Sequence, residues 1–89
     1  MKEWSRTYEI PAPQGYEDVK RLAEILADKG YKTKVDSHCC ILSRTEQIVG
    51  EIELVPRLGR TPGLLLVTAE TLFKEGRDLA AFLSGLEKL

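Results

Sequence analysis

The sequence predicts an α+β fold: a two-layer sandwich in which two helices cover one face of a mostly antiparallel, four-stranded sheet. Four segments show the alternation or the short apolar runs of strands, and two others have apolar residues at helical spacing. Their order along the chain is β-α-β-β-β-α, which is typical of such a sandwich. Because 89 residues are enough for one modest core, we expect a single α+β domain spanning residues 1–89.

The first strand and the first helix have the clearest boundaries. Residues Glu3–Ile10 alternate, with Tyr8 on the inner face, and Pro11 ends this strand because proline cannot donate to a strand ladder. Residues Tyr16–Lys29 carry apolar side chains on one narrow side of a helix. Gly30 then favours a left-handed stop of the Schellman type, with the next residue folded back on the helix.

The stretch Lys32–Leu54 is predicted to form two strands joined at Ser43–Glu46. A shift of one residue would set the apolar side of one strand beside the polar side of the other, so one register is favoured. That register turns these residues toward the helices: Val35, Cys39, Ile41, Ile48, Ile52 and Leu54. It turns these residues to the opposite, open face: Asp36, His38, Cys40, Glu51 and Glu53.

The remaining elements follow from proline, glycine and apolar content. Val55–Gly63 is predicted to be a loop, and Leu64–Ala69 is a short apolar run that suits a well-covered strand. Thr68 or Thr71 is placed to cap the last helix, which is expected to run to the C-terminus.

The last helix is apolar over roughly 200° of its circumference, more than the ~100–140° that a helix on one face of a core needs. Two explanations stand: the helix is sunk between the sheet and the first helix, or part of it is a subunit interface. For an interface we expect the residues Phe82, Leu86 and Leu89, with Leu58 of the loop as a further partner contact.

The loop also carries two arginines, Arg57 and Arg60. With Arg6 and Arg44 on strand ends they are predicted to form a small positive edge that suits phosphate or nucleic acid. A plain connector and a protein-contact loop are the alternatives, and Leu58 at the loop tip favours the latter.

One weak candidate for chemistry lies on the predicted open face. Asp36, His38, Glu51 and Glu53 together offer metal-ligand types, and His beside Glu could also act as a general acid or base. A solvated pair across two strands is the simpler alternative. Acidic residues on this face also argue against a sheet platform for RNA, since phosphates would be repelled.

Composition excludes several other classes of protein. The formal net charge is −1, so the whole molecule has no electrostatic reason to bind DNA, RNA or an anionic membrane. The apolar runs are too short to span a bilayer, and the first ten residues lack the core of a signal peptide, so we expect a cytoplasmic protein. Two adjacent cysteines do not make a disulfide framework, and the absence of Asn is compatible with a thermophilic source.

The sequence therefore predicts a small non-catalytic binding or assembly module without a cofactor, as a homodimer or as a subunit of a protein assembly. Self-association is expected through the C-terminal helix. The alternative is a nucleic-acid-binding domain that uses the basic loop of residues 56–63. A metal-dependent or acid–base enzyme on the open sheet face is the more distant alternative.

Overall fold

A computed structural model describes residues 5–35, 39–44 and 46–87. This part of the chain forms one sheet and two helices. In chain order the elements are β1 (Ser5–Pro11), α1 (Tyr16–Asp28), β2 (Lys32–Val35), β3 (Cys39–Arg44), β4 (Gln47–Val55), β5 (Leu64–Glu70) and α2 (Lys74–Glu87).

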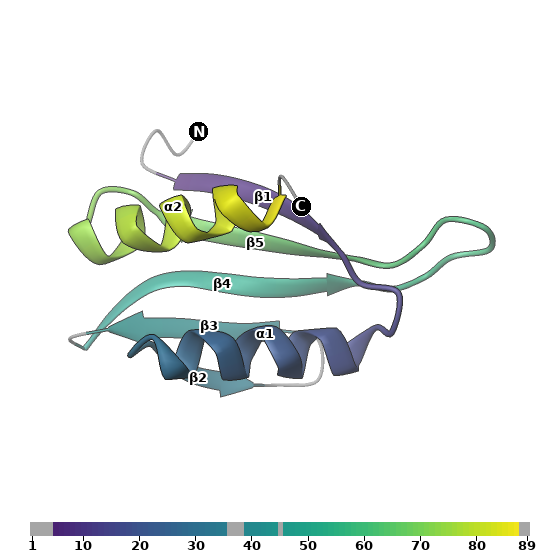
Figure 1. Ribbon diagram of the computed structural model, residues 1–89, viewed down its shortest axis with the longest axis horizontal. Coiled ribbons are helices and arrows are strands. Elements are labelled where there is room, and N and C mark those ends of the chain that lie inside the picture. Colours follow the sequence, from purple (N-terminus) through teal and green to yellow (C-terminus); the bar gives the residue numbers. More distant parts are fainter. Residues whose placement is uncertain (1–4, 36–38, 45, 88–89) are drawn as a thin grey trace.

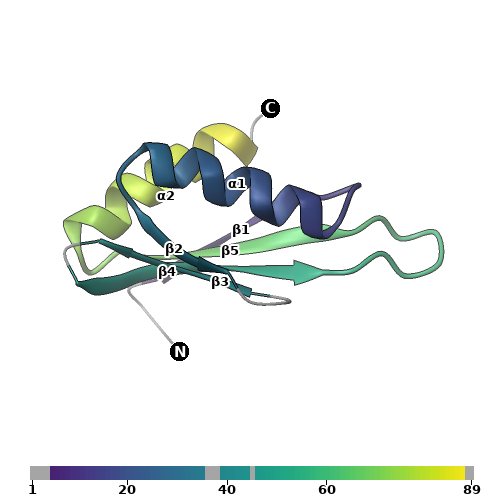
Figure 2. The same ribbon diagram turned by 90° about the horizontal axis from the view of Figure 1, so that it is seen from below.

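The strands lie in the order β1-β5-β4-β3-β2, and every neighbouring pair is antiparallel. Both helices cover the same face of the sheet (Figure 2), with α1 over the β2–β3 side and α2 over the β1–β5 side (Figure 1). The predicted α+β class and the placement of both helices on one face are therefore confirmed. The other face of the sheet carries no helix among the described residues.

The predicted number of strands is wrong, because the sheet has five strands rather than four. The first half of the stretch predicted as one hairpin is itself two strands, β2 and β3, which pair antiparallel from Lys32 opposite Ser43 to Val35 opposite Cys40. Residues 36–38, which join these strands, lie outside the described residues. Their sequence, Asp-Ser-His, begins with two residue types that favour turns, a cue that the alternation of apolar residues concealed.

The extra strand reverses the predicted faces of β3. Cys40 and Leu42 are fully buried against the helices, whereas Cys39 and Ile41 belong to the open face, opposite Glu53 and Glu51. The prediction that Cys39 and Ile41 pack under the helices is therefore wrong. It failed because it carried one alternation through residues 36–38 without a break.

A β-bulge changes the faces of β4 as well. Leu42 pairs with Gly50 but Ser43 pairs with Ile48, so Val49 is the extra residue on β4. Val49 is fully buried, and Ile48, which was predicted to face the helices, is 62% exposed. Beyond the bulge the prediction is confirmed for Ile52, which is fully buried.

The core lies between the sheet and the two helices. Its fully buried large side chains come from both layers, and each contributes roughly 1.5–3 kcal/mol to stability. They are Val19, Leu26, Leu42, Val49, Ile52, Leu65, Val67, Leu79 and Leu83. No buried side-chain nitrogen or oxygen among the described residues lacks a hydrogen bond.

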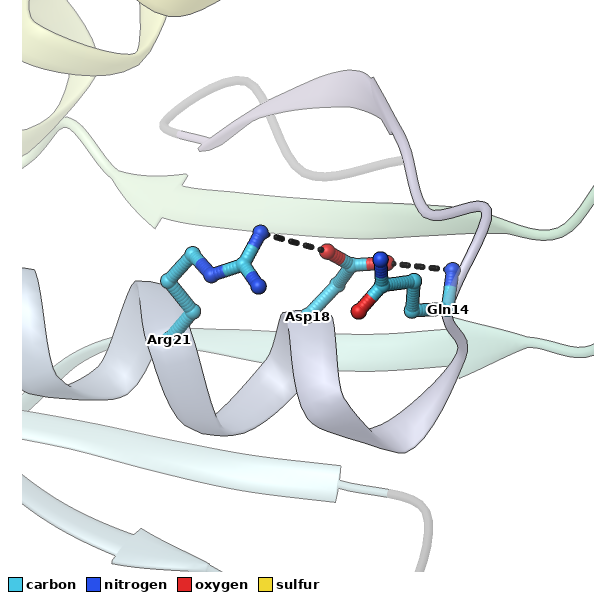
Figure 3. A network of polar contacts seen from close by, with 3 residues as sticks. All are labelled: Gln14, Asp18 and Arg21. Atoms are coloured by element: carbon cyan, nitrogen blue, oxygen red, sulfur yellow. Dashed lines mark hydrogen bonds and ion pairs between the residues drawn. The ribbon is translucent and has the colours of Figure 1, made fainter.

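Helix α1 is fixed at both ends. At its start the carboxylate of Asp18 accepts a hydrogen bond of 2.8 Å from the backbone N–H of Gln14 and lies 3.5 Å from Nη1 of Arg21 (Figure 3). At its end Gly30 has φ +97°, and the N–H of Tyr31 bonds to the carbonyl of Leu26 at 3.1 Å. The predicted Schellman stop is confirmed.

Candidate functional site: the β4–β5 arm and the open face

Between β4 and β5 the chain forms a hairpin arm, which we define as residues 56–63. Leu58 and Thr61 exchange backbone hydrogen bonds of 3.1 and 2.9 Å, so the arm is closed by a two-residue turn. Gly59 at the first turn position has φ +59°, as a type II′ turn requires. The arm projects beyond the rest of the fold (Figures 1 and 2). The predicted loop is therefore an ordered extension of the central strands.

The arm presents an apolar tip between two cations. Leu58 is 80% exposed, more than any other large hydrophobic side chain among the described residues. Arg57 and Arg60 are exposed and line one shallow hollow, and Nε of Arg57 donates to the carbonyl of Gly59 at 3.4 Å. No Asp or Glu occurs between Leu54 and Ala69, so the arm is locally positive.

The four arginines of the predicted positive edge do not lie together. Arg6 pairs with Ala69 and Arg44 with Gln47, both at the end of the sheet opposite the arm. Along β1 alone the separation from Arg6 to Pro11 is about 17 Å. The guanidinium of Arg44 lies 5.1 Å from the centroid of the Tyr31 ring, beside the core. Only Arg57 and Arg60 remain as neighbours.

The open face combines acidic and apolar side chains. The register sets Glu9, Leu66, Glu53 and Cys39 in one row across β1, β5, β4 and β3. The next row is Thr7, Thr68, Glu51, Ile41 and Lys34. The three glutamates are exposed, and the leucine and isoleucine are partly exposed. We use the name open face for these two rows.

The candidate for metal binding or acid–base chemistry is only partly within the described residues, because Asp36 and His38 lie outside them. Glu51 and Glu53 do lie on the open face, as predicted. The cysteine beside them is Cys39, whose Sγ is 3.9 Å from Oε2 of Glu51, and not Cys40. Within residues 5–35, 39–44 and 46–87 no group of three or more His, Cys, Asp or Glu side chains is placed to hold a metal ion.

Cys40 sits on the opposite side, in the core. Burial raises the pKa of its thiol, and the neighbouring Cys39 raises it further, while a backbone hydrogen bond from Lys34 acts in the other direction. The thiol form is therefore favoured, and a buried thiol of this kind behaves as a small apolar side chain.

The last helix uses most of its wide apolar arc inside this chain. Leu79 and Leu83 are fully buried, and Phe82 and Leu86 pack, partly buried, against the core. Nζ of Lys29, the residue after α1, lies 4.5 Å from the centroid of the Phe82 ring. Leu89, the third contact predicted on this helix, lies outside the described residues.

Sequence reasoning missed one hollow, which lies between β1 and α2 and has a volume of about 580 Å³. Arg6 and Tyr8 line it from the strand, and Arg77, Ala81 and Ser84 line it from the helix. The sequence did contain an indication of this hollow, because α2 carries small side chains on one side, next to an arginine. These residues form a hollow only because β1 lies beside this helix, which the sequence does not show.

Comparisons of the chain with models of protein families, with curated proteins and with solved structures found no match. Neither helix in the described part of the chain has the length and apolar content needed to cross a membrane.

Proposed function

We propose that this protein is a non-catalytic assembly module that self-associates, with the arm of each copy lying on the open face of a second copy. The observation that supports this most directly is the complementarity of the two surfaces. The arm is positive with an apolar tip, and the open face is acidic with apolar side chains at its centre.

The charges favour contact between unlike surfaces of two copies. Arg57 and Arg60 are the only charged residues of the arm, and Glu9, Glu51 and Glu53 are exposed on the open face. Complementary charges orient two partners and speed their encounter, although each exposed ion pair contributes only about 0–1 kcal/mol.

Apolar burial supplies the larger part of the stabilisation. Burying the exposed side chain of Leu58 contributes roughly 1.5–3 kcal/mol to the free energy of association. In a symmetric dimer both copies of Leu58 are buried, so this contribution is made twice. Partly exposed Leu66 and Ile41 lie between the glutamates of the open face and give this tip an apolar place to dock. An apolar centre within a charged rim is the common pattern of protein interfaces.

The register of the sheet allows a two-fold arrangement. Consider a two-fold axis that lies between the two open faces, runs perpendicular to the strands and is level with the paired residues Val55 and Leu64. Arg57 is two residues beyond Val55, and Glu53 is two residues before it. The axis therefore sets Arg57 of one copy level with Glu53 of the other, in a contact where each surface meets its complement.

The same axis places the tip of the arm. Arg60 is four residues before Leu64, and Thr68, which pairs with Glu51, is four residues after it. Arg60 of one copy is thus level with Glu51 of the other, and Leu58 is carried over the rows that contain Leu66 and Ile41. Both cations of the arm meet carboxylates in one arrangement.

This proposal keeps the predicted self-association but moves it from the C-terminal helix to the arm. Phe82 and Leu86 are already partly buried within the chain, whereas Leu58 is not. The alternative of nucleic-acid binding rests on two arginines, and Glu9 and Glu53 lie near the base of the arm, where they repel phosphates.

The first experiment is the molar mass in solution, measured by light scattering and by sedimentation velocity over a range of concentrations. We expect a dimer for the protein and a monomer for Leu58→Asp. The matched control is Leu72→Asp, because Leu72 is 54% exposed and lies at the end of the sheet opposite the arm. Loss of the dimer in both variants, or a monomeric parent protein, would contradict the proposal.

A charge exchange tests the pairing itself. Arg57→Glu and Glu53→Arg are each expected to weaken the dimer, and the double variant is expected to recover it, since the two charges meet across the interface. A double variant no better than the single ones would show that these residues do not pair. If the parent protein stays monomeric and instead binds a DNA duplex at low salt through Arg57 and Arg60, the nucleic-acid alternative replaces the proposal.

A further inference from the structure

The outer edge of β1 is open to an additional strand. β1 is the terminal strand of the sheet, and within the described residues no strand lies along its outer side. The N–H of Ala12 bonds to the carbonyl of Gly63 at 3.0 Å, which continues the β1–β5 register. In an antiparallel ladder hydrogen-bonded residues alternate, so the backbone N–H and C=O of Ser5 and Thr7 point away from β5.

The hollow described above lies directly beside this edge, on the side of the helices. Arg6 and Tyr8 of β1 form one wall, and Arg77, Ala81 and Ser84 of α2 form the other. It is open because α2 presents small side chains here. The volume of about 580 Å³ is enough for several side chains of a bound peptide.

The hollow is positively charged in the part of the chain that the structure describes. Among those residues Arg6 and Arg77 line it, and no carboxylate does. Arg77 is held in place because its Nη1 donates to the carbonyls of Thr71 and Leu72 at 3.2 Å, which leaves its other N–H groups for a ligand.

Among the described residues, the three carboxylates that lie close in sequence to this part of α2 do not line the hollow. Ala69 is buried under the helices, and neighbouring residues of a strand point to opposite sides of the sheet. The side chain of Glu70 therefore lies on the side of the sheet away from the helices. Asp78 and Glu75 of α2 act electrostatically on Tyr31, which follows the end of α1, and neither of them lines the hollow. Of the described residues, the two arginines are therefore the only charged side chains that line the hollow beside the β1 edge.

We propose that the β1 edge binds an extended acidic segment of a partner protein, which adds to the sheet as a sixth strand. The backbone of the segment would pair with Ser5 and Thr7, and every second side chain would point into the hollow. A Glu or Asp at such a position meets the guanidinium groups of Arg6 and Arg77. This surface is separate from the arm, so it serves a second partner beside the self-association proposed above.

The direct test uses a fluorescein-labelled peptide, Thr-Val-Glu-Val-Glu-Val-Thr, matched in length to the seven residues of β1. We expect saturable binding in fluorescence anisotropy. The lysine counterpart, Thr-Val-Lys-Val-Lys-Val-Thr, controls for the backbone and is expected not to bind. Arg6→Gln is expected to weaken the glutamate peptide about ten-fold, and Arg57→Gln on the arm is expected to leave it unchanged.

A pair of variants separates strand addition from simple anion binding. Thr7→Pro removes an outward N–H without removing a bond to β5, whereas Thr7→Val keeps that N–H. Both lose the 3.2 Å hydroxyl contact between Thr7 and Thr68, so they are matched in that respect. We expect binding to be lost in Thr7→Pro and kept in Thr7→Val.

Filling the hollow is a third check. Ala81→Leu places a larger side chain in it at an exposed position of a helix, where leucine is well tolerated, so the fold is kept. Peptide affinity is expected to fall with circular dichroism unchanged. The proposal is overturned if the glutamate peptide does not bind, if the lysine peptide binds equally well, or if Thr7→Pro binds as tightly as Thr7→Val.

Discussion

The hydroxyl of Tyr31 donates a hydrogen bond of 3.1 Å to the backbone carbonyl of Glu75 and so joins the end of α1 to the first turn of α2. The tyrosine is buried, and the guanidinium of Arg44 lies over its ring. Burial raises the pKa of the phenol above its usual 10.0, although Arg44 acts in the opposite direction. One side chain thereby connects the two helices that share the sheet.

Removing this hydroxyl should lower stability and change its pH dependence. Tyr31→Phe is expected to lose about 1 kcal/mol of unfolding free energy, measured in urea. Because the folded state holds the proton more tightly than the unfolded state, stability of the parent protein should fall as the pH rises above 10.0. Tyr31→Phe lacks this contribution. Tyr16→Phe, at an exposed position, is the control, and an equal loss in both variants would contradict the assignment.

Substitution by alanine at two glycines of α2 should change the stability of the protein in opposite directions. A Cβ at Gly76 would clash with the backbone carbonyl of Glu70, whereas a Cβ at Gly85 meets no atom within 4 Å. Gly85→Ala should stabilise the protein by up to ~1 kcal/mol through helix propensity. Gly76→Ala should destabilise it despite the same propensity gain. Thermal unfolding of the two variants measures the difference, and a stabilised Gly76→Ala would show that α2 does not start against β5.

The two isoleucines of β4 test the bulge. Ile52 is fully buried and Ile48 is 62% exposed. Ile52→Ala should cost about 2–5 kcal/mol, and Ile48→Ala less than about 0.5 kcal/mol. Chemical unfolding of both variants decides between the bulged register and an uninterrupted alternation, in which the two substitutions would be similarly costly.

The two cysteines should differ in reactivity. Cys39 is partly exposed on the open face, and Cys40 is fully buried with a raised pKa. Iodoacetamide at pH 8 should therefore modify one thiol per folded chain and two after unfolding, as counted by mass spectrometry. Cys39→Ala should remain unmodified while folded. Rapid modification of this variant would place Cys40 at the surface and reverse the faces of β3.

Apolar periodicity was sufficient for much of the fold. It placed α1 and its stop at Gly30, and it put Tyr8 on the inner side of β1. In each case one uninterrupted period runs through the whole element, so the side that faces the core can be read from the spacing alone.

The errors arose where the backbone breaks that period. Between Val35 and Cys39 the chain changes from one strand to the next, and at Val49 the bulge inserts an extra residue. Each event moves the following side chains to the other face, which a pattern of residue types alone does not reveal.

The candidate surfaces were harder to predict, because they depend on strand order. The exposed leucine and the arginines of the arm were recognised from their residue types. The separation of Arg6 from Arg57 and the hollow beside β1 depend on β1 lying next to β5, which no local pattern encodes.

The pairing of β1 with β5 also determines the order in which the strands can join the sheet during synthesis. Of the five strands in the described sheet, β1 is made first, yet its partner β5 ends at Glu70. Translation at about 5–20 residues per second leaves the N-terminal segment without its neighbour for several seconds, while the hairpins from β2 to β5 form through short connections. The strand that is made first therefore cannot enter the sheet before the strand that is made last.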